Sequence, residues 1–551
     1  MNRLGPVLLA IALLLLARPT SIGQLEQAFI DSHAASLERL FGLLDPSREE
    51  TDAIRRQWAL GQRLEAAHAL LAHLRQPPFP ETALVPLDLP LNIREQAEAA
   101  LSHRFFILGQ WIELQRAGPF LDWHQRGPSG DKEVAWMLNR QGFLPILAQA
   151  HVETGDPRFQ EAANALLLDW LAANPYPDRL TFSAPWRALE VARRLLNSWV
   201  HVFYQSDCLS PEARLLLLAS MPDHADALQE HTSFWGGNHL MTEKLALLLL
   251  SIAFPVFEQA PHWQTHALAE LERLFLGQSY PDGSYTELSN HYQRVVLVNA
   301  RTFHRLLQGV PAQSTSIATR ERLARMWDYF AGVTRPDGFG PLNNAGDAER
   351  NAAFLLSAWP EFDRPDWLYI ATGGIEGESP HAPPSRLYPW AGQAILRSGY
   401  SPRDSWVYFD AGPFGTAHQH VDRLHLSAFL QGQPILVDAG RYTYQPGKWK
   451  DYFSGPHSHN VLLINGQPAR QGPRRTNVPL PLSIESGTGY TFAESIGHFA
   501  PPASIAPWAT STVPWSRCLL LDDRGFLIVV DFVETHGPVD LQAIWNFDPG
   551  L

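Results

Sequence analysis

The feature that most constrains the fold is a change in hydrophobic pattern near Leu387. From Gln24 to about Leu387, apolar residues recur at helical spacing, and this part of the chain is rich in Leu, Ala, Glu and Arg. After Leu387, short alternating or apolar runs such as Ser405–Asp410 and Val461–Ile464 are typical of β-strands. The sequence therefore predicts an α+β protein whose helical half precedes a β-rich half.

Two turns in the helical half look related. Tyr280–Ser284 (YPDGS) and Arg335–Phe339 (RPDGF) each follow an amphipathic helix and begin 55 residues apart. Helical hairpins that repeat around a common axis produce such a spacing. The pattern favours a toroid or a solenoid of helices.

The pattern of the second half predicts antiparallel strands. Cys518–Leu521, the turn Asp522–Gly525 and the run Phe526–Val533 predict a strand, a turn and a second strand, as in a β-sandwich. The stretch Gly373–Pro384 is rich in Gly, Pro and Ser and is the expected linker. We therefore expect domains at residues 24–385 and 386–551. The chain stops just after the strand-like run Leu541–Phe547, which leaves open whether the β-domain is complete.

Residues 1–23 have the pattern of a secretory signal peptide, with a lone cation at Arg3, an apolar run from Val7 to Ala17 and small residues at the end. No later stretch approaches the roughly 20 apolar residues that a membrane-spanning helix requires. We expect a periplasmic or secreted bacterial protein without a membrane span. An uncleaved amino-terminal anchor is the alternative.

The formal net charge of −13 argues against nucleic acid or an anionic membrane surface as the general partner. If the substrate is anionic, its positive contacts must be local. The two cysteines, Cys208 and Cys518, lie far apart in sequence and are expected to be free buried thiols. The pattern does not determine an oligomeric state.

The densest polar cluster is Gly412–Asp422, with the sequence GPFGTAHQHVD. In an extended segment His418 and His420 point to the same face. Adding Asp438 and His459 to His420 gives three nitrogen or oxygen donors of the kind that zinc takes, with a fourth position open. The alternative is that these histidines are surface or hydrogen-bonded residues.

Two further clusters lie in the helical half. In Phe234–His239 (FWGGNH), the Gly-Gly pair lets Asn238 and His239 face a cleft at the start of a helix expected from Leu240 to about Ala253. Alternatively, Asn238 simply caps that helix. The segment Asp282–Gln293 runs from a turn into a helix and contains Tyr292; taken alone, such a tyrosine is more often a packing residue than a catalyst.

Together these motifs resemble the heparinase II/III family of polysaccharide lyases, which includes related alginate lyases. The β-domain series HQHVD, LVDAGRYTY and HSHNVLLINGQ follows the family's order, and GGNH and ELSNHYQ resemble its motifs in the helical domain. The resemblance covers nearly the whole chain. It implies an α/α-toroid followed by an antiparallel β-sandwich.

The resemblance also implies a function, which is cleavage of an anionic, uronate-containing polysaccharide by β-elimination. Asn238 and His239 would neutralise the uronate carboxylate, while Tyr292 and His418 would transfer protons. The implied ligands of a structural divalent metal, zinc by this reading, are His420, Asp438 and His459. His457 forms a second His-x-His with His459 and is the alternative ligand. The expected substrate contacts are Arg441, Trp235 and Glu287, and for Arg441 a surface role is equally open.

The residue types suit an elimination. Donors aimed at the carboxylate stabilise the charge that builds when C5 of a uronate loses its proton. A Tyr292 phenolate can remove that proton and then protonate the leaving oxygen in a syn elimination. For the opposite epimer, His418 is the expected base and Tyr292 the acid. The metal would brace the loop that carries His418, because an elimination consumes no water.

Two other functions compete. A glycoside hydrolase on the same fold needs paired carboxylates, and those available are Asp282, Glu287, Asp337 and Asp347. A noncatalytic glycan-binding or exopolysaccharide assembly protein would use tryptophans as sugar platforms, with Trp186, Trp235, Trp390 and Trp449 as the candidates. The sequence leaves open which glycan is bound, and whether it is attacked at its ends or internally.

Overall fold

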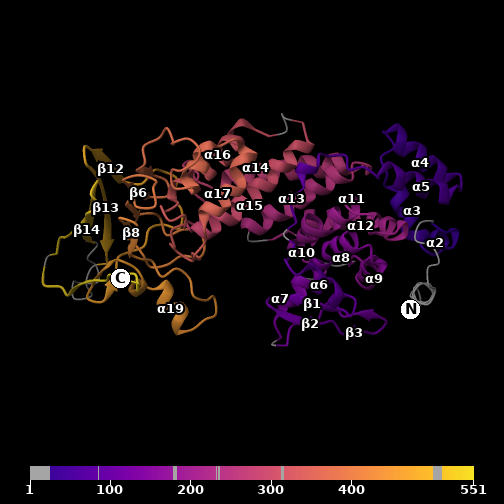
Figure 1. The fold of residues 1–551 in the computed structure, drawn as a ribbon, viewed down its shortest axis with the longest axis horizontal. Helices are drawn as coiled ribbons and strands as arrows, with labels where there is room; N and C mark the ends of the chain where they lie inside the picture. The colour runs from indigo at the N-terminus through magenta and orange to yellow at the C-terminus, as the bar shows by residue number, and fades with distance from the viewer. Residues whose placement is uncertain are drawn as a thin grey trace. The chain divides into compact units, whose positions relative to one another are not determined.

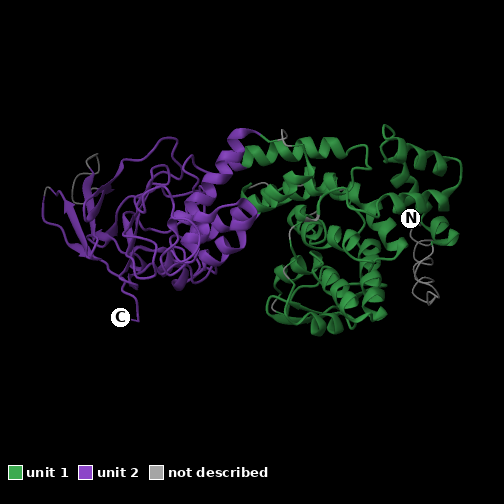
Figure 2. Ribbon diagram, turned by 45° about the horizontal axis from the view of Figure 1, so that its top comes forward, with its two compact units in different colours: residues 1–274, 299–315 green, residues 275–298, 316–551 purple. Residues whose placement is uncertain are grey.

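The computed structural model describes residues 25–550, apart from residues 85, 88, 129, 178–182, 231, 234–235, 312–314, 501–511 and 536. The expected signal peptide at 1–23 and the expected substrate contact Trp235 therefore lie outside the described residues. The chain divides into two compact units (Figure 2). Unit 1 comprises residues 1–274 and 299–315, and unit 2 comprises residues 275–298 and 316–551.

Unit 1 is mainly helical, as the hydrophobic spacing predicts (Figure 1). Helix α13 (Gly237–Ala253) is buried at every position from Leu240 to Ala253, which explains why its sequence is apolar on nearly all sides. The other helices that begin in unit 1 are α2 (Gln27–Ser32), α3 (Ala34–Gly42), α4 (Glu49–Ala59), α5 (Arg63–His73), η1 (Glu81–Ala83), α6 (Ile93–Ala100), α7 (Lys132–Asn139), α8 (Phe143–Thr154), α9 (Pro157–Ala173), α10 (Ala188–Arg194), the π-helical η2 (Leu195–Trp199), α11 (Val200–Tyr204), α12 (Pro211–Glu230), α14 (Ala260–Gly277) and η3 (Leu307–Gly309).

Local signals set the ends of these helices. Helix α8 ends at Thr154, and its C-cap is Gly155, whose φ of 70° is the left-handed conformation that glycine adopts without strain. Asp156 follows as the N-cap of α9, and its side chain accepts a hydrogen bond of 3.0 Å from the backbone N–H of Arg158. Pro157 then occupies the first helical turn, where its missing N–H costs nothing.

The helical half also contains two hairpins that the sequence analysis did not predict. Strand β1 (Arg104–Ile107) pairs with β2 (Gln110–Glu113), and β3 (Arg116–Ala117) pairs with β4 (Phe120–Leu121). This half is helical as predicted, apart from these two short hairpins. Strands of two to four residues contain too few alternations to show a period in the sequence.

The two related turns of the sequence have the same structure. The N–H of Gly283 donates to the carbonyl of Tyr280 at 2.9 Å, and that of Gly338 donates to Arg335 at 3.0 Å. Both glycines have positive φ, 92° and 83°. A Cβ at Gly283 would lie 2.0 Å from the carbonyl oxygen of Arg325, so glycine is required there. Closure of the helices into a toroid stays a prediction.

Unit 2 contains helices and three antiparallel sheets, with strand orders β5-β6-β7-β8-β9, β12-β13-β14-β15 and β11-β10-β16. This confirms the predicted β-rich half. Its strands are β5 (Arg386–Tyr388), β6 (Gln393–Arg397), β7 (Trp406–Asp410), β8 (His425–Leu430), β9 (Gln433–Leu436), β10 (Leu462–Ile464), β11 (Gln467–Pro468), β12 (Leu482–Gly487), β13 (Tyr490–Phe499), β14 (Val513–Asp522), β15 (Leu527–Val533) and β16 (Leu541–Ala543). The helices that begin in unit 2 are α15 (Asn290–Leu306), α16 (Ile317–Val333), α17 (Asn351–Phe362), α18 (Pro365–Ala371), α19 (Lys448–Ser454) and η5 (Pro456–Ser458).

The five-stranded sheet is buried on both faces. One face, which includes Val407 of β7, shares a core with the four-stranded sheet, as in a sandwich. The other face, which includes Tyr408, packs on residues of α16 and on Leu288. Burial on both faces explains why these strands read as continuous apolar runs. The sheet thereby brings the loop after β7 to the segment before α15, where the N–H of Thr416 donates to the carbonyl of Thr286 at 3.1 Å.

The last helix before the sheets, α18, ends at Ala371, and the first strand after it begins at Arg386. The Gly373–Pro384 linker fits that gap, whereas a domain boundary at residue 385 stays a prediction. Cys208 and Cys518 are both free, as expected; Cys208 is buried, whereas Cys518 is only partly buried, so the expected burial is wrong for Cys518. Within the described ranges, no helix has the length and apolar character needed to cross a bilayer.

Candidate active site

The first element of the site is a stacked pair of aromatic side chains. Tyr292 lies in the first turn of α15, which begins at Asn290. Its ring stacks on His418, from the loop after β7, with the ring centroids 3.9 Å apart and the planes 13° apart. The Tyr292 hydroxyl forms a 2.6 Å hydrogen bond with the hydroxyl of Tyr444. The structure thus brings together the two residues expected to transfer protons.

His418 is held by a carboxylate. Its Nδ1–H donates to Oε2 of Glu287 at 2.6 Å, and Oε1 of Glu287 accepts a 3.3 Å hydrogen bond from Tyr285. A carboxylate at Nδ1 selects the tautomer in which Nε2 keeps its lone pair and can accept a proton. The backbone φ of His418 is 62°, an unfavourable value for a non-glycine residue that costs roughly 1–3 kcal/mol and is often found at functional sites. Glu287 was expected to contact substrate; its carboxylate instead engages His418.

Burial controls the protonation of Tyr292. Burial, reinforced by the hydrogen bond to Tyr444 and the charge of Glu287, raises the pKa of Tyr292 well above its usual value, against a smaller opposite effect of Arg441. A raised pKa keeps the phenol neutral near pH 7. The structure therefore favours Tyr292 as a proton donor, and the phenolate expected for a syn elimination is not its resting form.

Arg441, expected to contact substrate, already has a carboxylate partner. Its Nε donates to Oδ1 of Asp347 at 3.2 Å, and its Nη2 donates to Oδ2. Such a two-pronged pair fixes the guanidinium plane. That plane lies over the ring of Tyr444, 4.3 Å from its centroid. Arg441 therefore orients the tyrosine that is hydrogen-bonded to Tyr292.

A loop that the sequence analysis missed braces the site. The side-chain amides of Asn343 and Asn344 both donate to the carbonyl of Leu288, at 2.5 and 2.9 Å. The side-chain oxygen of Asn344 also accepts from the N–H of His420 at 2.9 Å. Asn344 thus ties the segment that carries Glu287 to the segment that carries His418. An Asn-Asn pair close to a glycine is common in turns, so the sequence did not distinguish it.

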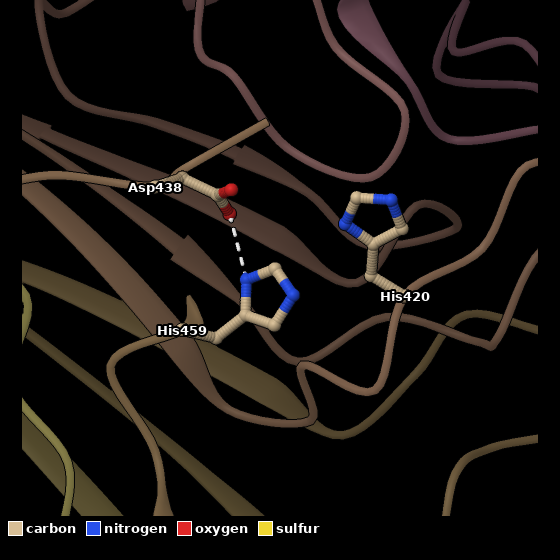
Figure 3. Close-up of side chains that lie close together, drawn as sticks. All are labelled: His420, Asp438 and His459. Carbon is tan, nitrogen blue, oxygen red and sulfur yellow. Dashed lines mark hydrogen bonds and ion pairs between the residues drawn. The ribbon is translucent and has the colours of Figure 1, made fainter. Parts of the chain in front are cut away.

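The predicted metal ligands converge in the interior of unit 2 (Figure 3). One donor atom from each of His420, Asp438 and His459 lies within 4.8 Å of the others, and the three residues are 0–5 % exposed. Nδ1 of His420 and Nε2 of His459 are buried without a hydrogen-bond partner, as expected of atoms that bind an ion. His457 is exposed, so the geometry favours His459 as the ligand.

The protonation states suit a cation at this cluster. Burial lowers the pKa of His420 to about 4, which leaves the neutral imidazole that metals bind. Burial alone would raise the pKa of Asp438, but the neighbouring His459, His425 and His420 outweigh it and lower that pKa to about 2. Burial likewise opposes the charged form of His459, yet Asp438 raises its pKa. A protonated His459 and a metal ion are therefore alternative ways to balance the buried carboxylate.

Two residues beside the cluster hold it in place. His425, which the sequence analysis did not single out, places Nε2 3.3 Å from Oδ2 of Asp438. The N–H of Asn460 donates to Nδ1 of His425 at 3.0 Å, and its side-chain amide donates to the carbonyls of Leu426 and Val437. The asparagine that follows His459 thus fixes the strands around the ligands.

In unit 1, Asn238 and His239 lie half-buried in the first turn of α13. The N-cap of α13 is Gly236, and no side chain caps the helix, so the capping alternative for Asn238 is wrong. Thr242 and Asn299 donate hydrogen bonds to the backbone carbonyl of Asn238, at 2.9 and 3.2 Å. These contacts hold the backbone at the start of the helix and leave the side chain of Asn238 out of the capping role.

His239 lies in a positive environment. Burial lowers its pKa, and the charges of Arg187, Arg193 and Arg140 lower it further, against the opposing charge of Glu190. Glu190 is fully buried and pairs with both Arg140, at 2.6 Å, and Arg187. Three guanidinium groups around one carboxylate leave a local excess of positive charge. An acidic chain needs such a local excess to bind an anion.

The carboxylates required by a hydrolase are all engaged elsewhere. Oδ2 of Asp282 accepts from the backbone N–H groups of Trp390 and Ala391 at 2.8 and 2.9 Å. Asp337 pairs with Arg335, while Glu287 and Asp347 have the partners described above. None of the four therefore forms a free pair of the kind that glycoside hydrolysis uses.

The fold and the site define a protein in which helices precede antiparallel sheets, with a stacked Tyr–His pair and a buried His–Asp–His cluster. Residues 40–361 match the heparinase II/III N-terminus, and residues 380–550 match the heparinase II/III-like C-terminal region. The chain belongs to the heparinase II/III family, which confirms the predicted family.

A heparin-sulfate lyase of Bacteroides thetaiotaomicron is 22% identical to this chain over 462 residues. The match covers 76% of this chain and 65% of that protein, so this chain spans less than two thirds of the relative's length. A mutant heparan sulfate lyase from Pedobacter heparinus has a similar structure, with a TM-score of 0.75, 21% identity, and coverage of 93% of this chain and 80% of that one. A heparinase III gene product is also similar, with a TM-score of 0.74, 20% identity, and coverage of 91% of this chain and 80% of that one. These likenesses confirm the α+β fold.

Proposed function

We propose that this protein is a polysaccharide lyase that cleaves a uronate-containing, anionic glycan by β-elimination. The observation that carries the proposal is the stacked Tyr292–His418 pair, in which Glu287 holds Nδ1 of His418. The printed names of the relatives, heparin-sulfate lyase and heparan sulfate lyase, support the same class of reaction.

The proposed chemistry divides the proton transfers between the two rings. Nε2 of His418 accepts the proton from C5 of the uronate, and the neutral phenol of Tyr292 protonates the departing glycosidic oxygen. The electron pair of the C5–H bond forms the C4–C5 double bond as the C4–O bond breaks. The raised pKa of Tyr292 supports this division of roles.

The negative charge of the transition state collects on the uronate carboxylate. We assign its neutralisation to Asn238 and His239, on the basis of the motif resemblance and the positive surroundings of His239. Arg441 acts on substrate only through Tyr444 in this proposal, since its guanidinium is paired with Asp347.

For the cluster of His420, Asp438 and His459 we propose a divalent cation, zinc by the nature of the donors. Such an ion would supply fixed positive charge that joins three separate segments of unit 2. His420 follows His418 by two residues, so anchoring His420 limits the movement of the proposed base. We also propose that residues 1–23 direct export to the periplasm or the medium, on the signal-peptide pattern of the sequence.

The test is ultraviolet absorbance of the purified protein incubated with a panel of uronate polysaccharides, beside a Tyr292→Phe control. New absorbance from an unsaturated uronate, lost in the control, is the expected result. Reducing ends that are released without that absorbance would instead indicate a hydrolase.

A further inference from the structure

The segment 441–454 (RYTYQPGKWKDYFS), which contains α19, has an exposed aromatic surface. Tyr442, Tyr444, Trp449 and Tyr452 are 65%, 44%, 52% and 44% exposed. Of the tryptophans that the sequence offers as sugar platforms, Trp186 is buried, Trp390 is partly buried and Trp449 is exposed. Large aromatic side chains grouped on a surface mark binding sites more often than isolated ones do.

The rings of this surface support one another. Tyr442 stacks on Phe453 with centroids 5.4 Å apart and planes 20° apart, and it lies 6.2 Å from Trp449. Trp449 in turn lies 6.4 Å from Tyr452 in an edge-to-face arrangement. Side chains that are held by their neighbours lose little freedom when a ligand binds. The segment therefore presents a preformed platform.

The charge on the platform is positive. The whole chain contains four lysines, and two of them, Lys448 and Lys450, flank Trp449. Nζ of Lys448 lies 5.3 Å from the Trp449 ring centroid, and neither ammonium has an ion-pair partner among the described residues. Asp451 is the acidic residue of α19. The whole chain has a net charge of −13, so two unpaired ammonium groups beside aromatic rings are a local exception that suits an anionic sugar chain. The C–H faces of the sugar rings would stack on the aromatic rings, and the carboxylate or sulfate groups of the sugars would pair with the lysines.

The platform is continuous with the proton-transfer pair. Tyr444 lies between Tyr442 and α19 in sequence, its hydroxyl bonds to that of Tyr292 at 2.6 Å, and its ring lies 5.7 Å from that of His418. The platform residues lie on both sides of Tyr444 in the protein segment 441–454. A glycan whose cleaved bond lies at Tyr292 would therefore extend past Tyr444 onto the platform.

We propose that Tyr442, Trp449 and Tyr452, with Lys448 and Lys450, form a second binding subsite for the anionic glycan, which holds sugar units beyond those that react. The subsite rests on the proposed lyase function and adds a preference for long chains. Figure 1 shows α19 outside the labelled strands of unit 2.

The experiment measures binding without turnover. Tyr292→Phe protein is the parent, and calorimetry gives Kd for a tetrasaccharide and a dodecasaccharide of each uronate glycan in the panel. Two variants are made in the parent: Trp449→Ala, and Lys448→Gln with Lys450→Gln. The matched control is Phe526→Ala, because Phe526 is 62% exposed and has Arg524 over its ring at 5.4 Å, but lies far from α19 in sequence.

In both α19 variants, we expect the gain in affinity from tetrasaccharide to dodecasaccharide to shrink about tenfold, and to stay unchanged in the Phe526→Ala control. If the variants keep the full gain while the wild type produces unsaturated uronate, the subsite is wrong and the lyase stands. If the parent binds no glycan of the panel and the wild type cleaves none, both proposals fail. Should Trp449→Ala misfold by circular dichroism, the lysine variant decides.

Discussion

Replacing Glu287 with glutamine tests whether His418 works through its carboxylate. The side chain of Glu287 is 10% exposed, and its oxygen lies 2.6 Å from Nδ1 of His418. A hydrogen bond to a charged group contributes about 1.5–3 kcal/mol, which corresponds to about a 10- to 150-fold change in rate. Glutamine keeps the size of the side chain but removes the charge, and its NH₂ can donate to Nδ1 and select the wrong tautomer.

The assay is the initial rate of unsaturated-uronate formation, separated into kcat and KM, on the glycan that the wild type cleaves best. We expect Glu287→Gln to lower kcat by the amount above with little change in KM, because Glu287 acts through His418 rather than on substrate. Glu287→Asp, which retains the charge, should recover part of the loss.

The structure supplies a matched control in the same unit. Glu494 of β13 is half-buried and accepts a 2.8 Å hydrogen bond from the hydroxyl of Ser516, so Glu494→Gln removes a carboxylate far in sequence from both Glu287 and His418. A Glu287→Gln protein with the wild-type kcat, or an equal loss in Glu494→Gln, would refute the positioning of His418 by Glu287.

Three further predictions concern the site and the fold. Because burial raises the pKa of Tyr292, its phenol stays protonated above the usual tyrosine pKa of about 10, and the kcat of the wild type should show no alkaline fall near that pH; a fall there in the pH–rate profile would contradict the raised pKa. Chelation should lower the unfolding temperature and kcat, with recovery on adding zinc, because removing a cation leaves the buried carboxylate of Asp438 without that balancing charge. The His420→Ala protein should be insensitive to the chelator, and a sensitivity equal to that of the wild type would argue against this site. Gly283→Ala should lower the free energy of unfolding in urea by about 1–3 kcal/mol or more, because the new Cβ would clash with the Arg325 carbonyl and the φ of Gly283 is 92°. Gly61→Ala should lower it less, because Gly61 also has a positive φ but its Cβ would meet open space.

Much of the architecture follows from local pattern. Helical spacing before Leu387 and apolar runs after it predict the order of helices and sheets, and the strand pair around Asp522–Gly525 forms as β14 and β15. The family motifs likewise point to His420, Asp438 and His459 as one cluster, and the fold does bring their donor atoms within 4.8 Å of one another. These features can be predicted because hydrophobic periodicity, turn residues and family motifs are each recognisable within a short stretch of sequence. The short hairpins β1–β4 escape prediction because two to four residues show no period.

What the tertiary structure decided is the set of partners for each polar side chain. His418 and Glu287 are 131 positions apart, and only the packing of the sheet on α16 and Leu288 makes them neighbours. The same is true of Arg441 and Asp347, and of the choice between His457, which is exposed, and His459, which is buried. A sequence shows which donors, acceptors and charges a chain contains. Their hydrogen bonds and pKa values depend on distance and burial, which exist only once distant segments are folded against each other.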